Sequence, residues 1–233
     1  MKATGEVMGI GATLEECILK SVRSLEIGVC HLYMPKFEAM PTDEILEYVS
    51  EFHDDSIFAA AQLIRSGVPI EKIHEATEIT ELFLESIAKI VDMEKLLSEN
   101  PNSADILGQA KKMGFSDKFI AKLWKCSELS VYDMRSKNML YPVYKMVDTC
   151  HTGAYIPYFY STYSADKNEQ RMSDKKKIIV LGAGPIRIGQ GVEFDYSTVH
   201  AVTTIKKSGY EAIIINNNPE TVSTDYTTAD KLY

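Results

Sequence analysis

Apolar residues recur every three or four positions from Leu14 to about residue 137, and glycine, proline or polar residues interrupt them at short intervals. This spacing places the apolar side chains on one face of an α-helix. Thr13 and Glu16 predict a capping box in front of a first helix, which Gly28 would end. The apolar stripe of this helix would consist of Leu14, Ile18, Val22 and Leu25.

The same pattern predicts further short helices, beginning at Thr42, at Asp54 or Asp55, at Ile79 and at Ser103. The longest would run from about Ile79 to Leu97. Its apolar stripe would comprise Leu82, Phe83, Ile87, Ile90, Val91 and Leu97. No stretch between residues 12 and 140 has the two-residue alternation of a strand, so the sequence predicts an all-α domain here.

Residues 116–137 predict two short helices joined by a tight turn at Cys126 and Ser127. The side chains expected to face inward are Ile120, Ala121, Leu123 and Val131. This arrangement resembles a helix-turn-helix, so a DNA-binding module is one alternative function. However, the second helix would offer acidic as well as basic side chains to the phosphates: Glu128, Asp133, Arg135 and Lys137. Helix pairs of this spacing are also common in ordinary bundles.

The helical period is lost from Tyr141 onward. Tyr155–Tyr163 is dense in tyrosine and predicts an extended, partly buried segment suited to an interface. Cys150 and His151 are adjacent, as a nucleophile and its base would be, but neighbours in sequence rarely face each other productively. A buried thiol beside a surface histidine is the simpler interpretation. Residues 164–176 are polar without an apolar period and predict a linker.

A run of β-branched residues, Ile178–Leu181, leads into a glycine-rich stretch and then a helical pattern over about 192–207. Gly209 would end that helix, and Ala212–Ile215 would form a second strand. These elements predict a βαβ unit whose first strand is buried on both faces. Tyr233 comes before a third strand is complete, so we expect an unfinished sheet and hence a fragment. The predicted fold class is mainly α, with an all-helical domain followed by an incomplete, Rossmann-like α/β segment.

A glycine-rich turn between a strand and a helix commonly binds phosphate through backbone N–H groups. The dinucleotide-binding form has glycines at the first, third and sixth loop positions and an acidic residue after the second strand. Gly182 and Gly184 fit, but Arg187 occupies the sixth position and asparagines follow the second strand. A nucleotide-binding oxidoreductase is therefore a disfavoured alternative, and the lack of Gly-Lys-Ser/Thr excludes a P-loop. A purely structural role for both glycines, permitting a tight turn, stays open.

Composition narrows the function classes. The chain of 233 residues has 45% hydrophobic residues and a net charge of −8, which disfavours nucleic acids and anionic membranes as partners. No apolar run is long enough to span a membrane, and the N-terminus lacks the profile of a signal peptide. The cysteines lack metal-ligand spacing and are expected to be free thiols in the cytoplasm: Cys17, Cys30, Cys126 and Cys150.

Two long motifs point to a family. Gly182–Tyr196 (GAGPIRIGQGVEFDY) and Asn218–Tyr226 (NPETVSTDY) closely resemble the large subunit of carbamoyl phosphate synthetase. The resemblance extends to Pro142–Lys145 and Val147–Cys150, whereas His151–Tyr155 departs from the family pattern. In order along the chain, it implies the tail of the first ATP-grasp half (1–11), a helical oligomerisation domain (12–163), a linker (164–176) and the start of the pre-ATP-grasp domain of the second half (177–233).

The resemblance also implies an activity. The parent enzyme would be a ligase that makes carbamoyl phosphate from bicarbonate, glutamine-derived ammonia and two ATP, for arginine or pyrimidine synthesis. It would use ATP with Mg or Mn, and K, whose ligands lie outside this chain. The chain alone would be inactive, without a cofactor, metal or catalytic residue. Implied partners are the glutaminase small subunit, the rest of the large subunit and further copies through the helical domain.

In the family, the glycine loop does not hold the nucleotide but lines a tunnel that carries carbamate between the two active sites. The resemblance places Gly191, Glu193 and Glu220 on that tunnel. A small residue at Gly191 would keep the passage open, and Glu220 would offer a hydrogen-bonding wall. Gly182, Gly184 and Gly189 would shape the loop itself.

Overall fold

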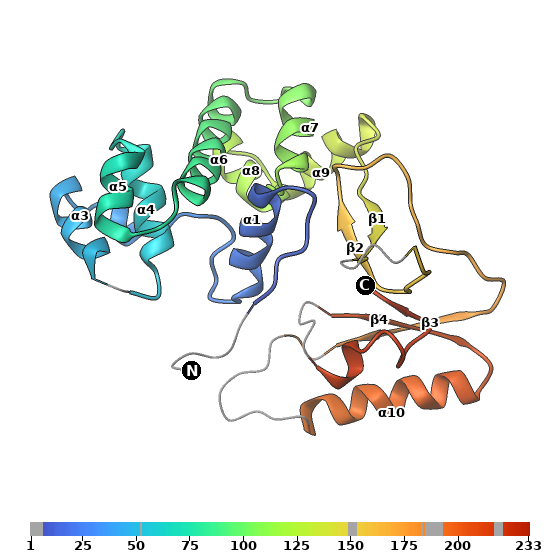
Figure 1. Cartoon of the computed structure of the whole chain (residues 1–233). Coiled ribbons are helices and arrows are strands. Elements are labelled where there is room, and N and C mark those ends of the chain that lie inside the picture. Colours follow the sequence, from blue (N-terminus) through green and yellow to red (C-terminus); the bar gives the residue numbers. More distant parts are fainter. Residues whose placement is uncertain (1–6, 52, 149–152, 183, 185–192, 217–220) are drawn as a thin grey trace. The chain divides into compact units, whose positions relative to one another are not determined.

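The computed structural model describes residues 7–51, 53–148, 153–182, 184, 193–216 and 221–233, with the side chains of Glu193 and Phe194 left out (Figure 1). The chain divides into two compact units. The first, Ala12–Tyr141, is called the helical unit below. The second, called the α/β unit, comprises Met1–Gly11 and Pro142–Tyr233.

Helices account for the regular structure described in the helical unit. In chain order they are α1 (Leu14–Ser24), α2 (Pro35–Glu38), α3 (Thr42–Ser50), α4 (Ser56–Arg65), α5 (Ile70–Thr77), α6 (Glu81–Glu99), α7 (Ala104–Lys112), α8 (Asp117–Trp124) and α9 (Glu128–Lys137). The predicted all-α domain is therefore confirmed for the described residues of this unit, as is the turn between α8 and α9.

Serine and threonine N-caps explain where several of these helices begin. The side-chain oxygens of Thr13, Ser103, Ser116 and Ser127 each accept the backbone N–H three residues ahead, at 3.1–3.4 Å. Such a cap satisfies one of the N–H groups that a helix start leaves without a partner. At α1 the Glu16 carboxylate also accepts the backbone N–H of Ala12 at 2.9 Å.

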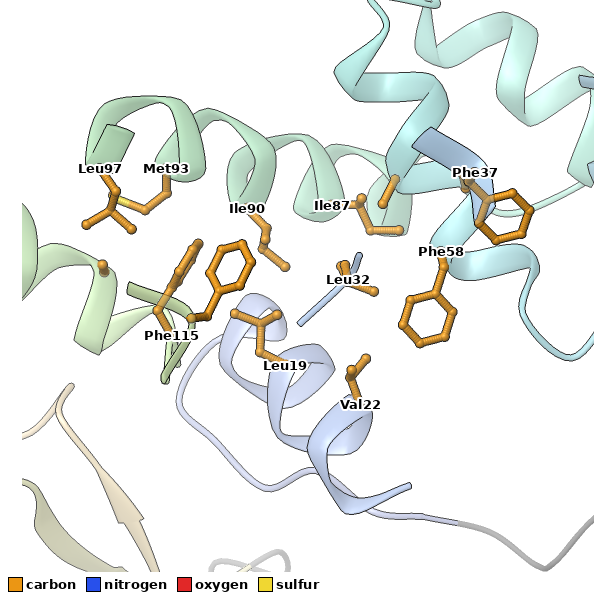
Figure 2. Close-up of a cluster of buried hydrophobic side chains, with 14 of the residues drawn as sticks. Leu19, Val22, Leu32, Phe37, Phe58, Ile87, Ile90, Met93, Leu97 and Phe115 are labelled. Carbon is orange, nitrogen blue, oxygen red and sulfur yellow. The ribbon is translucent and has the colours of Figure 1, made fainter. Parts of the chain in front are cut away.

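The core of the helical unit forms around α6, which packs against α1, α4, α5, α7 and α8. Figure 2 shows the side chains that meet along this helix, including Leu19 and Val22 of α1, Ile87 and Ile90 of α6, and Phe115. All five are at most 3% exposed. Burial of large apolar side chains is the main favourable term for such a bundle.

The predicted stripe of α6 was partly wrong. Leu82 and Phe83 are 60% and 45% exposed, whereas Leu84 and Met93 lie in the core. The helix begins at Glu81, and its buried positions follow Leu84 at helical spacing through Ile87, Ile90 and Leu97. Leu82 lies two residues before Leu84, about 200° around the helix axis, so it faces away from the buried positions.

The α/β unit contains two small sheets. The strands β1 (Val143–Met146) and β2 (Phe159–Thr162) form an antiparallel pair. The strands β3 (Lys177–Leu181), β4 (Glu211–Ile215) and β5 (Lys231–Leu232) form a parallel sheet in the order β3-β4-β5. The helix α10 (Glu193–Lys207) connects β3 to β4, which confirms the βαβ prediction. A short 3-10 turn, η1 (Val222–Thr224), precedes β5.

The predicted burial of β3 on both faces was wrong. Ala212 and Ile214 of β4 are buried with Val202 of α10, and Val180 packs against them. On β3, however, Ile179 and Leu181 are 56% and 75% exposed. β3 is an edge strand of this sheet, and its Ile179 side points away from the α10 face because side chains alternate along a strand.

The units divide at Tyr141, whereas the sequence placed the end of the helical domain at residue 163. The β1–β2 pair belongs to the α/β unit because Tyr158 pairs with Leu232 and the Leu232 N–H donates to the Pro157 carbonyl at 2.8 Å. Phe159 also packs on Tyr233, with ring centroids 5.3 Å apart. The predicted extended tyrosine segment is thus confirmed where β2 forms, and its role as an interface stays a prediction.

The predicted linker is hydrogen-bonded within the α/β unit. Asn168 accepts the backbone N–H of Tyr144 at 2.8 Å, and Glu169 accepts that of Met146 at 2.6 Å. Ser173 donates to the buried Glu211 at 2.7 Å. Residues 164–176 therefore cross the unit as an ordered segment rather than as a free connection.

Candidate functional site

The glycine loop begins at the carboxyl edge of the parallel sheet, where ligands commonly bind in α/β folds. Gly182 follows β3 directly, and its N–H donates to the carbonyl of Ile215 at 2.8 Å. Asn216 follows β4, and its Oδ1 accepts the N–H of Gly184 at 3.2 Å. The Asn216 side chain thus ties the start of the loop to the neighbouring strand.

Both described glycines are required by geometry. A Cβ at Gly182 would lie 2.4 Å from Cγ of Asn216, closer than real contacts allow. Gly184 has a φ of +77°, which favours glycine. The role of Asn216 was not predicted, because the sequence pattern indicated only that an asparagine is the wrong residue for a ribose contact.

A second connection lies at the start of α10. Asp195, in the first turn, is 2% exposed, and its Oδ2 accepts the backbone N–H of Ser223 in η1. Ser223 is itself fully buried. This contact joins the motif that contains the glycine loop to the motif that contains Glu220, and sequence reasoning missed it.

The other residues predicted for the glycine loop and the tunnel lie largely outside the part of the chain that the structure describes. Gly189, Gly191 and Glu220 lie outside the described residues, and Glu193 is described only as the first backbone position of α10. Cys150 and His151 also lie outside them. The structure therefore brings Gly182 and Gly184 together with Asn216, and leaves the tunnel residues as predictions.

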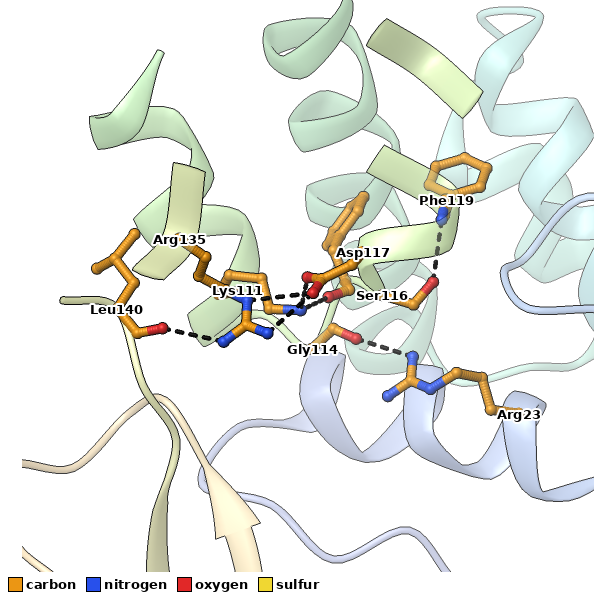
Figure 3. A network of polar contacts seen from close by, with 9 residues as sticks. Arg23, Lys111, Gly114, Ser116, Asp117, Phe119, Arg135 and Leu140 are labelled. Atoms are coloured by element: carbon orange, nitrogen blue, oxygen red, sulfur yellow. Dashed lines mark hydrogen bonds and ion pairs between the residues drawn. The ribbon is translucent and has the colours of Figure 1, made fainter. Parts of the chain in front are cut away.

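The helix pair α8–α9 forms as expected, but Arg135, one of the two basic side chains of α9, is buried. Arg135 is 8% exposed and donates from Nε and Nη2 to Asp117, at 3.1 and 3.0 Å, and from Nη1 to the Leu140 carbonyl (Figure 3). Lys111 donates to the same carboxylate at 2.7 Å. Burial lowers the pKa of Lys111. Burial acts to raise the pKa of Asp117, but the hydrogen bonds from Lys111 and Arg135 lower it. Arg135 is thus used inside the unit, which argues against phosphate binding by α9.

Within the described ranges, no group of three or more His, Cys, Asp or Glu side chains is arranged to hold a metal ion. Cys17, Cys30 and Cys126 form no disulfide there. No helix of that part of the chain is both long and apolar enough to cross a membrane.

Comparison with protein families matches both units. Residues 6–139 match the model described as carbamoyl-phosphate synthetase large chain, oligomerisation domain. Residues 174–233 match the model described as carbamoyl phosphate synthase preATP-grasp domain. The first match covers more than half of the chain and coincides with the helical unit, and the second contains the parallel sheet and the glycine loop. The chain therefore belongs to the carbamoyl phosphate synthetase large-chain family, whose members are ligases, and it carries the oligomerisation and preATP-grasp regions of that family.

Proposed function

We propose that this chain is a section of the large chain of a glutamine-dependent carbamoyl phosphate synthetase, in which it supplies an assembly domain and part of the passage between two active sites. The observation that carries this proposal is the link between its two family motifs. Asn216 holds the start of the glycine loop, and Asp195 holds the turn after Glu220. The first contact acts on the start of the glycine loop at Gly184, and the second joins the start of α10 to η1.

The parent reaction explains why a passage is needed. One half makes carbamate from bicarbonate, ammonia and ATP, and the other phosphorylates carbamate with a second ATP. Carbamate breaks down in water, so a closed route protects it. Gly191 would contribute no side chain to this route, and Glu193 and Glu220 would contribute polar walls. We expect the chain alone to have no turnover, because the ATP and metal ligands of both halves would lie elsewhere in the large chain.

The cofactors and partners of the parent belong to the same proposal. ATP with Mg or Mn, and K, would bind to ATP-grasp residues elsewhere in the large chain. A glutaminase small subunit would supply ammonia in the cytoplasm, and the product would enter arginine or pyrimidine synthesis. The helical unit would join copies of the large chain.

The test uses the intact synthetase with Gly191→Phe. A side chain in the passage should let carbamate escape, so the ATP hydrolysed per carbamoyl phosphate formed should rise severalfold. Bicarbonate-dependent ATP hydrolysis by the first half, and ATP formation from carbamoyl phosphate and ADP by the second, should each stay within about twofold. Gly108→Ala, within α7, is the control and should keep the native ratio. If Gly191→Phe kept the native ratio of ATP hydrolysed to carbamoyl phosphate formed, the tunnel proposal would be wrong.

A further inference from the structure

Asp195 is a buried carboxylate with an unusual hydrogen-bonding position. It lies in the first turn of α10, where a negative charge is favoured by the helix dipole, yet it is 2% exposed. Its Oδ2 accepts the Ser223 backbone N–H, and its Oδ1 has no hydrogen bond within the described part of the chain. Burying a charged group with few partners is unfavourable, so its position needs a compensating role.

The turn that Asp195 contacts is rigid in itself. The Thr221 N–H donates to Oγ1 of Thr224 at 3.0 Å, and the Thr224 N–H donates to the Thr221 carbonyl at 3.1 Å. Asp225 accepts the backbone N–H and the hydroxyl of Thr227 at 2.8 and 2.7 Å. These contacts stay within the turn. The Asp195 carboxylate provides a hydrogen bond that connects this turn to the start of α10.

We infer that Asp195 is a positioning residue for carbamate transfer. It fixes the distance between two segments that follow the proposed tunnel residues in sequence: α10, which follows Gly191, and η1, which follows Glu220. The inference rests on the proposed function, and it assigns to Asp195 no contact with carbamate. Loss of the hydrogen bond should let the two segments separate and carbamate leak, without harming the chemistry in either half.

A purely structural role predicts a different result. If Asp195 only stabilised the start of α10, its removal would lower the melting temperature but leave the coupling between the two halves unchanged. The coupling ratio, ATP hydrolysed per carbamoyl phosphate formed, therefore separates the two roles.

The experiment compares variants of the intact synthetase. Asp195→Ala should raise the coupling ratio severalfold while each partial reaction stays within about twofold of the wild type. Asp195→Asn, whose amide oxygen still accepts the Ser223 N–H, should stay within about twofold in the ratio as well. Asp225→Asn removes an exposed carboxylate from the same turn and should leave the ratio unchanged. If Asp195→Ala is insoluble, Asp195→Ser, which is too short for this contact, takes its place with the same expectation.

The possible outcomes distinguish a failure of the role of Asp195 from a failure of the proposed tunnel. A native ratio in Asp195→Ala or Asp195→Ser, together with a raised ratio in Gly191→Phe, would overturn the role of Asp195 alone. A native ratio in that Asp195 variant and in Gly191→Phe would overturn the tunnel as well. A ratio in Asp195→Asn as high as in Asp195→Ala would overturn the role of the hydrogen bond.

Discussion

Asn216 determines which residue can begin the glycine loop. Its side chain occupies the space that a Cβ at Gly182 would need, and its Oδ1 receives the Gly184 N–H. The sequence identified both glycines as suited to a tight turn. It could not identify Asn216, because the contact depends on two parallel strands that are separated by the helix α10.

Gly182→Ala should destabilise the parallel sheet by about 1–3 kcal/mol, since the methyl group must displace Asn216 or the backbone. Hydrogen exchange of the β3 and β4 amides measures this loss. Gly108→Ala is the matched control, because a Cβ there would meet Leu140 at an ordinary 3.7 Å. It should stabilise the helical unit by up to about 1 kcal/mol. Unchanged exchange of β3 and β4 in Gly182→Ala would contradict the assigned contact.

At the scale of elements, α6 and α8 meet through a buried histidine. His31 is 1% exposed and stacks on Phe119 of α8, with ring centroids 3.6 Å apart. Its Nε2 lies 2.7 Å from Oε1 of Glu94 in α6, which also pairs with Arg65 of α4. Burial is the main cause that lowers the pKa of His31. The hydrogen bond to Glu94 and the charge of that carboxylate act to raise it, and the smaller effects of Arg65 and Arg23 lower it.

This lowered pKa predicts acid sensitivity of the helical unit. Below about pH 6.5 the unfolded chain binds a proton at His31 that the folded chain resists. The free energy of unfolding should therefore fall as the pH drops from 7 to 5, by at most about 1.4 kcal/mol per pH unit. Trp124, the one tryptophan in the sequence, lies in α8 and reports urea unfolding of this unit.

His31→Gln should remove most of that slope between pH 7 and 5. His53→Gln, a change at a half-buried histidine that stacks on Tyr48, should keep it. If both variants kept the slope of the wild type, His31 would not be its origin. Carboxylates such as Glu94, whose pKa is lowered by Arg65 and His31 despite its burial, act at lower pH.

Helix starts were predictable because a capping serine or threonine acts on its own next turn, as at Ser103 and Ser127. The buried face of α6 was harder to predict, because it depends on how α1, α4, α5, α7 and α8 pack around this helix. The place of the β1–β2 pair could not be predicted, since it depends on the contact of Tyr158 with Leu232, distant in sequence. The Asp195–Ser223 contact was missed for the same reason.

At the scale of the whole molecule, the chain combines a helical unit with its own core and an α/β unit whose loops carry the family motifs. The family matches divide along the same line. The proposed function assigns assembly to the helical unit and carbamate transfer to the α/β unit, so a defect in one should leave the other measurable.

Sedimentation equilibrium of the whole chain tests the central claim most directly, because we propose that the helical unit joins copies of the large chain. The chain has a mass of 26.1 kDa. We expect a mass at least twice that of the chain at micromolar concentrations, which falls toward the monomer value on dilution. A single species of monomer mass at every concentration, up to the highest that stays in solution, would contradict the account.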